Sequence, residues 1–140
     1  EPGGALLSEY GGPGTPLGLG QPVDALATPY GLWAVTSEDG RLWNLYADAS
    51  LAAVARAVSI DGPHLAGLDD GSFFLSDPTR QRVLRFTAQG RPVQQFSQQG
   101  AFALPTGIAV AEIGGEVYLA VVDTQRCTLS LWRAPRTLLR

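Results

Sequence analysis

The 140-residue sequence contains no methionine and no lysine, and it has only one cysteine and one histidine. A single cysteine excludes an internal disulfide bond. A single histidine cannot supply the several histidine ligands of a catalytic zinc site from one chain. No stretch approaches the roughly 18 or more apolar residues that a membrane-spanning helix needs. These absences argue against a disulfide scaffold, a histidine-rich metal centre within one chain and a transmembrane protein.

Glycine and proline are abundant instead, with 17 and 10 residues, and 45% of the sequence is hydrophobic. This composition suits strands joined by tight turns, and the apolar content is high enough for a packed core. The length corresponds to one domain or to a part of one. The cysteine, Cys127, falls in an apolar stretch, so we predict a buried, unreactive thiol.

The sequence repeats itself about every 41 to 46 residues. Three prolines, Pro22, Pro63 and Pro105, open three similar segments. Each segment continues with apolar runs that are separated by a glycine turn and by a polar turn ending near an arginine. Self-similarity of this period, with about four short strands per repeat, predicts β-propeller blades. We therefore predict an all-β fold of β-propeller-type, four-stranded antiparallel blades, about three of them, in a partial arc.

Local signals place the turns and strands within each repeat. Asp69-Asp70-Gly71, Glu38-Asp39-Gly40 and Gly114-Gly115 predict hairpin turns, because glycine tolerates a positive φ and aspartate accepts local backbone hydrogen bonds. The stretch 91–96 predicts a fourth strand in the middle repeat. The stretch 51–60 fits an outer strand, whereas the alanine-rich stretch 48–57 also fits a short helix.

The repeat boundaries divide the chain into four segments. We predict an N-terminal segment with an unpaired outer strand at 1–21, blade 1 at 22–62, blade 2 at 63–104, and a three-stranded blade 3 with a C-terminal tail at 105–140. The stretch from Leu6 to Gly14 is similar to the end of blade 2, whereas the third repeat has no clear fourth strand. An N-terminal strand of one copy could therefore complete the third blade of another copy.

The repeats resemble NHL repeats, a family of propeller blades. Pro105-Thr106-Gly107-Ile108-Ala109-Val110 fits the opening of an NHL unit, and Asp77-Pro78-Thr79-Arg80 and Asp123-Thr124-Gln125-Arg126 fit its loop. Phe96-Ser97-Gln98-Gln99-Gly100 and Tyr10-Gly11-Gly12-Pro13-Gly14 fit its closing turn. The first repeat departs from the pattern, because Thr36 stands at the position of the loop aspartate. The resemblance implies a propeller, and NHL propellers are mostly interaction platforms, although some bind RNA and a few are enzymes.

The charges are unevenly distributed along the chain. Residues 1–77 carry a net charge of −8, and residues 78–140 carry +5. Solvated turns can differ in this way without a function, but ends of opposite charge also attract each other within or between molecules. Overall acidity and the absence of lysine argue against a nucleic-acid partner. We predict a protein partner instead, and the candidate contact residues are Arg80, Arg82, Arg85, Arg91, Arg133, Arg136, Tyr10 and Trp132.

The candidates for chemistry are few. His64 follows Pro63 at the start of a predicted inner strand, where a side chain can face the propeller axis, but a structural or surface role is the favoured interpretation. Asp77 and Asp123 recur at one loop position of successive repeats, so we interpret them as residues that shape the loop. We predict no catalytic residue, no metal site and no cofactor.

An arc of about three blades leaves the faces of its end blades bare, and soluble monomers rarely expose apolar patches of that size. We therefore predict a non-catalytic interaction or scaffold subunit that completes or docks on a larger assembly of identical or different chains. Two alternatives stay open: a lyase- or lactonase-type propeller enzyme with an axial metal site formed by two chains, and a fragment of a longer NHL propeller. The missing initiator methionine and the propeller class predict an extracytoplasmic location, periplasmic or secreted.

Overall fold

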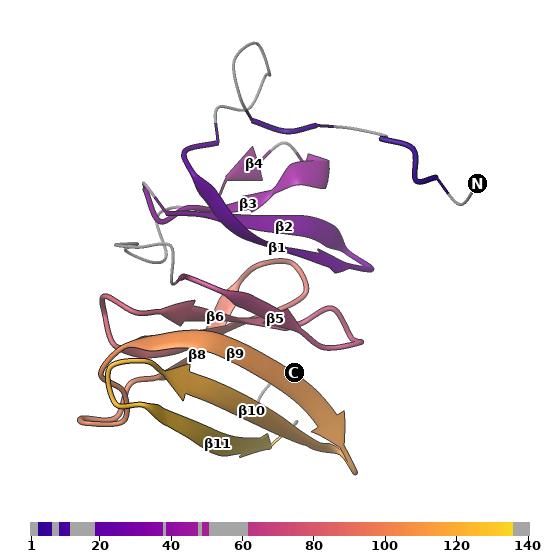
Figure 1. The fold of residues 1–140 in the computed structure, drawn as a ribbon. Helices are drawn as coiled ribbons and strands as arrows, with labels where there is room; N and C mark the ends of the chain where they lie inside the picture. Colours follow the sequence, from indigo (N-terminus) through magenta and orange to yellow (C-terminus); the bar gives the residue numbers. More distant parts are fainter. Residues whose placement is uncertain are drawn as a thin grey trace.

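The computed structural model of the chain describes residues 3–6, 9–11, 19–37, 39–47, 49–50 and 62–135, and it consists of three antiparallel sheets (Figure 1). The first sheet has the order β1-β2-β3-β4 and the second the order β5-β6-β7-β8. The third has the order β11-β10-β9. The strands are β1 (Pro22–Thr28), β2 (Gly31–Thr36), β3 (Leu42–Asn44), β4 (Ala49–Ser50), β5 (Leu65–Gly67), β6 (Phe73–Asp77), β7 (Arg82–Phe86), β8 (Pro92–Phe96), β9 (Pro105–Ile113), β10 (Glu116–Asp123) and β11 (Thr128–Pro135). A single turn of 3-10 helix, Leu45–Ala47, separates β3 from β4.

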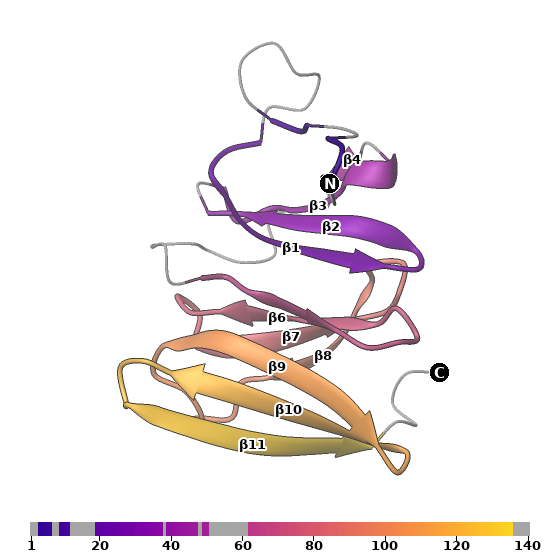
Figure 2. The same ribbon diagram turned by 45° about the vertical axis from the view of Figure 1, so that its right-hand side comes forward.

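Each sheet is a meander in which consecutive strands pair, and the second sheet lies between the other two (Figures 1 and 2). The predicted all-β fold of propeller-type antiparallel blades in a partial arc is confirmed. Two predicted turns are confirmed as well. In the first, the amide of Gly71, which has a φ of 83°, donates to the Leu68 carbonyl at 2.9 Å. In the second, Gly114 and Gly115 have φ values of 61° and 81°, the left-handed conformation that a two-residue hairpin requires.

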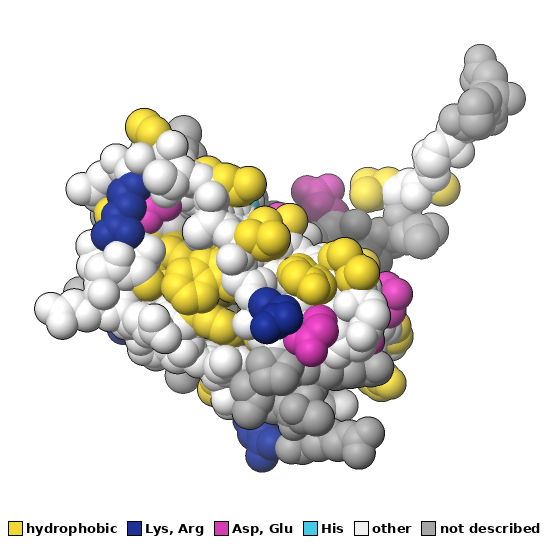
Figure 3. Space-filling view, turned by 90° about the horizontal axis from the view of Figure 1, so that it is seen from below, with side chains coloured by type: hydrophobic (Ala, Val, Ile, Leu, Met, Phe, Trp, Pro, Cys, Tyr) yellow, Lys and Arg dark blue, Asp and Glu magenta, His cyan; other side chains and the backbone are white. Residues whose placement is uncertain are grey.

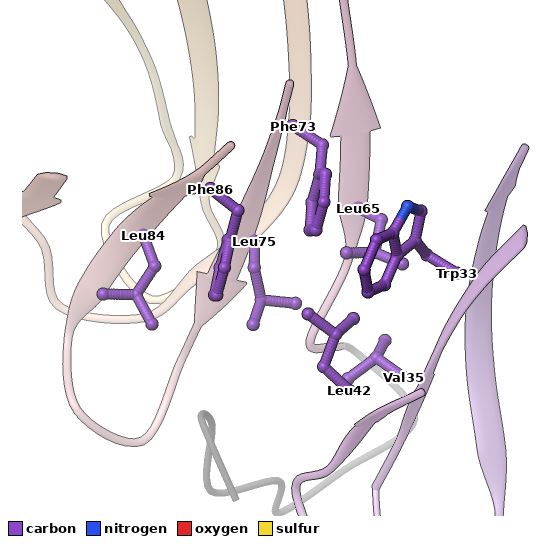
Figure 4. Close-up of a cluster of buried hydrophobic side chains, with 8 residues drawn as sticks. All are labelled: Trp33, Val35, Leu42, Leu65, Phe73, Leu75, Leu84 and Phe86. Carbon is purple, nitrogen blue, oxygen red and sulfur yellow. The ribbon is translucent and has the colours of Figure 1, made fainter. Parts of the chain in front are cut away.

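A first core fills the space between the first and second sheets (Figure 4). Its centre is aromatic: the rings of Trp33 and Phe73 are 4.9 Å apart, and Phe73 stacks on Phe86 at 5.0 Å. Strands β1 and β5 approach each other closely here. A Cβ atom at Gly67 of β5 would lie only 3.0 Å from the Leu26 side chain of β1. The buried members of this core are Trp33, Val35, Leu42, Leu65, Phe73, Leu75, Leu84 and Phe86.

A second core lies between the second and third sheets. Phe74 points into it, because successive side chains of β6 alternate between the two neighbouring sheets. All five residues of β6 are therefore buried. The connection from β8 to β9 adds Phe102, whose ring lies 5.4 Å from that of Trp132. The buried members of this core are Leu68, Phe74, Val83, Phe102, Val117, Leu119 and Val121.

Asp123 fixes the chain between the second and third sheets. Its carboxylate accepts hydrogen bonds from the backbone amides of Ala103 (2.6 Å), Leu104 (3.1 Å) and Arg126 (3.1 Å). Burial alone would raise the pKa of Asp123, but the three amide donors and the Arg126 charge outweigh burial and lower it. Asp77 holds the equivalent loop of the second sheet and accepts a bond from the Arg82 Nε atom at 2.8 Å. These contacts agree with the interpretation of both aspartates as loop-shaping residues.

The prediction for Cys127 is wrong. The residue ends the turn between β10 and β11 with a φ of 54°, and its side chain is exposed. Its neighbours Leu129 and Leu131 made the stretch look like one apolar strand, but the strand begins only at Thr128. Residues 3–6 and 9–11 lie in no strand, and the remainder of the predicted N-terminal strand lies outside the described residues, as do Glu38 and the stretch 51–60. The predicted N-terminal strand stays a prediction.

Candidate interaction surface on the third sheet

The third sheet has one covered face and one open face. On β10, Val117, Leu119 and Val121 point into the second core. The intervening residues of β10 point the other way, since side chains alternate along a strand. The cross-strand register adds their partners on β9 and β11. The same register places the charged pair Glu116 and Arg133 on this side, at the end of the sheet near the β9–β10 turn. We call this surface the open face; its apolar residues are Ala109, Ala111, Ile113, Tyr118, Ala120, Val122, Leu129 and Leu131.

Most of the open face is apolar, and its large side chains are accessible to solvent. Leu129 is 70% exposed, Leu131 69% and Ile113 63%. Together with Val122, they are four of the seven large exposed hydrophobic side chains among the described residues. The view from below shows hydrophobic side chains gathered on this side of the molecule, with charged side chains beside them (Figure 3). Arg133, whose Nε atom lies 4.0 Å from the Glu116 carboxylate, belongs to this border.

The third sheet also has a free edge. The first and second sheets each have four strands, whereas the third has three. Within the described part of the chain, no strand pairs with the outer side of β11. The backbone amide and carbonyl groups along such an edge can form hydrogen bonds with another strand.

The predicted arginine contacts have different surroundings. Arg82 donates from Nε to Asp77 and from Nη1 to the Gln95 side chain at 2.9 Å, so it helps to hold its own sheet. Arg80 is partly exposed at 4.0 Å from the Asp77 carboxylate, and Arg91 is exposed in the turn before β8. Arg133 borders the open face, and Arg136 lies outside the described residues. Among the described members of this set, the structure therefore brings only Arg133 to the open face.

Arg85 is not a surface residue, which corrects the prediction that it contacts a partner. Its side chain is fully buried between the second and third sheets, with the guanidinium carbon 5.1 Å from the centre of the Phe74 ring. The loss of water on burial lowers the pKa of Arg85, while the charge of Asp70 acts in the opposite direction. No hydrogen-bond partner of its side-chain nitrogens occurs in the described structure. Arg85 is buried because side chains alternate along β7. Arg85 lies two residues after Val83 and therefore points to the same face, which the third sheet covers.

The two predicted aromatic contacts are also only partly available. Trp132 points toward the second core, where it packs against Phe96 and Phe102, and its indole Nε1 donates to the Ser130 hydroxyl at 2.9 Å. Tyr10 is half-buried near the N-terminus. The large residues of the open face were not singled out from the sequence. Their signal, the alternation of Leu129 and Leu131, is the same signal that marks a buried strand.

His64 lies between the first and second sheets. Its Nδ1 atom is 3.3 Å from the Asp24 carboxylate, which also accepts the amide of Leu65 at 2.7 Å. The Ser76 hydroxyl accepts the His64 amide at 2.9 Å and donates to the Thr106 carbonyl at 2.7 Å. The serine therefore bonds to backbone groups and not to the imidazole. In the described ranges, no three His, Cys, Asp or Glu side chains come together as metal ligands would.

No protein-family model matches the sequence, and no curated protein does. Solved structures are similar in fold. Virginiamycin B lyase from Staphylococcus aureus matches with a TM-score of 0.55 at 12% identity, over 81% of this chain and 41% of that chain. A streptogramin B lyase matches with a TM-score of 0.54 at 14% identity, over 79% and 40%. This chain thus spans about two fifths of the length of these propellers, and at such low identity the likeness shows the fold alone.

The described residues contain no helix of the length and apolar character that crossing a bilayer requires.

Proposed function

We propose that this chain is a non-catalytic interaction subunit of NHL-like blades, and that a second copy of the chain docks on its open face to complete a propeller. The observation that carries the proposal is the exposed apolar surface of the third sheet. Covering it would take about two thirds of the side chains of Leu129, Leu131 and Ile113 out of water. At about 1.5–3 kcal/mol for complete burial of such a side chain, these three contribute roughly 3–6 kcal/mol.

The second core indicates what kind of surface fits the open face. There, the second and third sheets pack face to face through alternating apolar side chains. A further propeller-type sheet would meet the open face in the same way. The outer side of the first sheet has matching chemistry, because Ala25, Ala27 and Leu32 alternate with the residues of the first core on β1 and β2. In a two-fold pair, each first sheet would cover the third sheet of the other copy.

Two further observations support a second copy. The chain covers 41% of the virginiamycin B lyase chain, so two copies would supply about the length of one such propeller. The charges are also complementary: the first half, with a net charge of −8, would meet the second half, with +5. Opposite charges across an interface favour encounter and fix its orientation.

The test is the solution mass of the full chain, measured by light scattering across a range of concentrations. We expect a dimer of twice 14.8 kDa. Leu131→Glu places a charge on the open face and should give a folded monomer. Gln89→Glu adds the same charge at an exposed position in the β7–β8 turn and should leave the dimer intact. A wild-type monomer at every concentration would contradict the proposal and favour either a different partner or a longer propeller chain.

The alternative, a lyase-type enzyme with an axial site, draws on the names of the two lyases and on the pair formed by His64 and Asp24. It requires ligands from two chains, because the described residues of one chain bring no three ligating side chains together. Metal analysis of the purified dimer separates the two functions. Stoichiometric zinc or calcium that is lost in His64→Ala would favour the enzyme.

A further inference from the structure

The free edge of β11 presents a defined set of backbone groups. The turn Gly114–Gly115 joins β9 to β10, and the residues that flank a two-residue turn exchange both of their hydrogen bonds. Bonding then alternates along β10, so that Val117, Leu119 and Val121 direct their peptide groups toward β11. The residues opposite them on β11 use their own peptide groups for hydrogen bonds with β10. The peptide groups that face the free edge belong to Leu129, Leu131 and Arg133.

The second sheet shows how a fourth strand fits this edge. The loops before β7 and β11 are equivalent: each has four residues between an aspartate and the next strand, and each ends in a positive φ, 53° at Gln81 and 54° at Cys127. Val83 on β7 therefore corresponds to Leu129 on β11, and Leu84 to Ser130. In the second sheet, β8 lies antiparallel to β7 and pairs Phe96 with Val83 and Gln95 with Leu84.

The N-terminal segment has the sequence of such a strand. Tyr10 and the glycine turn after it correspond to Phe96 and the turn that follows β8. Glu9 then corresponds to Gln95. In this chain Leu6 is 81% exposed, and the indigo stretch that carries it projects away from the sheets in Figure 1. The described residues of this segment lie in no strand.

The side chains of the third sheet also leave room for the aromatic ring of the added strand. In the second sheet, the Phe96 ring packs against Phe74 with 6.2 Å between the ring centres. The residue equivalent to Phe74 in the third sheet is Ala120, since Phe74 pairs with Arg85 and Ala120 pairs with Leu131. The alanine leaves room for a tyrosine ring on the open face.

We propose that the edge of β11 binds the N-terminal segment of a second copy as an antiparallel fourth strand, with Tyr10 opposite Leu129 and Glu9 opposite Ser130. The inference rests on the proposed function, because it names the element of the second copy that completes the third sheet. The added strand satisfies the free peptide groups of β11, and Tyr10 covers part of the open face. The N-terminal segment leads along the chain into β1 of the first sheet, and in the two-fold pair this sheet would lie next to the third sheet of the other copy.

Disulfide trapping tests the register. In a Cys127→Ser background, full chains with Glu9→Cys are mixed with full chains with Ser130→Cys and oxidised mildly. These positions form a non-hydrogen-bonded pair, for which Cα atoms are about 4.5 Å apart and a disulfide fits. The matched control replaces Ser130→Cys with Thr128→Cys, a diagonal position about 7–8 Å away. Because disulfides outside the normal range are strained, we expect about a tenfold or greater excess of the aligned heterodimer.

The outcomes separate this inference from the proposed function. Equal yields for the aligned and control pairs, with the wild-type chain still dimeric by light scattering, would overturn the strand pairing and leave the docking on the open face intact. A monomeric wild-type chain would overturn both. A chain that carries Glu9→Cys and Ser130→Cys together, and closes the disulfide within itself at high dilution, would also overturn the pairing between copies. Circular dichroism of each single variant confirms that it is folded.

Discussion

Asp123→Asn is predicted to weaken the junction between the second and third sheets. One carboxylate oxygen accepts the amides of Leu104 and Arg126, and the other accepts the amide of Ala103 at 2.6 Å. Asparagine retains a single acceptor oxygen. Its amide nitrogen would face the amide of Ala103, so two donors would oppose each other in a site that is 2% exposed.

The magnitude follows from the bonds that are lost. A hydrogen bond to a charged group contributes about 1.5–3 kcal/mol, and a buried donor without an acceptor costs about 1–3 kcal/mol. We therefore expect Asp123→Asn to lower the free energy of unfolding by about 2–4 kcal/mol, a large part of the roughly 5–15 kcal/mol of a typical domain. Asp69→Asn, at an exposed position in the β5–β6 turn, is the matched control and should change stability by less than about 0.5 kcal/mol.

The effect of Asp123→Asn on stability should depend on pH. The pKa of Asp123 is lower in the folded chain than its ordinary value, because the backbone amides favour the carboxylate. The carboxylate therefore stabilises the fold at pH values above the ordinary aspartate pKa of about 3.9, and this contribution is lost as the pH falls through the lower, folded pKa. The difference in stability between wild type and Asp123→Asn should be full at neutral pH and should shrink in acid.

Urea denaturation followed by tryptophan fluorescence measures this effect. Trp132 reports on the junction directly, because it packs against Phe102 in the connection that Asp123 holds. Equal stability of wild type and Asp123→Asn at neutral pH, or a difference that does not shrink in acid, would show that the Asp123 carboxylate does not stabilise this junction.

The remaining predictions concern packing and backbone conformation. Phe73→Ala should lower the free energy of unfolding by about 3–5 kcal/mol in urea denaturation, since Phe73 lies at the centre of the first core; a loss below 1 kcal/mol would contradict this packing. Gly71→Ala should destabilise more than Gly100→Ala in thermal unfolding, because both have a positive φ but only at Gly71 would a Cβ atom collide with a neighbour, the Tyr30 ring. Arg85→Met should be neutral or stabilising in the same assay, because it removes buried nitrogens that have no partner in the described structure; a loss of several kcal/mol would show that the guanidinium has a favourable role.

The parts of the fold that depend on neighbours along the chain were predictable from the sequence. The spacing of Pro22, Pro63 and Pro105 predicted the period of the sheets, because each repeat is one supersecondary unit. The turns at Gly71 and at Gly114-Gly115 were predictable because few residues other than glycine adopt a positive φ at low cost. The recurrence of Asp77 and Asp123 at one loop position likewise indicated a role in shaping each loop.

Burial was less predictable, because an alternating strand does not show which of its faces another sheet will cover. The β6 and β11 strands are both rich in large apolar residues, yet β6 is buried on both sides and β11 exposes Leu129 and Leu131. Arg85 was expected at the surface from its charge, but its place in the alternation of β7 puts it against the third sheet. Local conformational preferences, which can be read from the sequence, thus account for the repeat, the strands and the turns. Which faces meet depends on packing between residues that are distant in the chain, such as Trp33 and Phe73, and local preferences cannot specify it. This packing leaves the open face of the third sheet exposed to solvent.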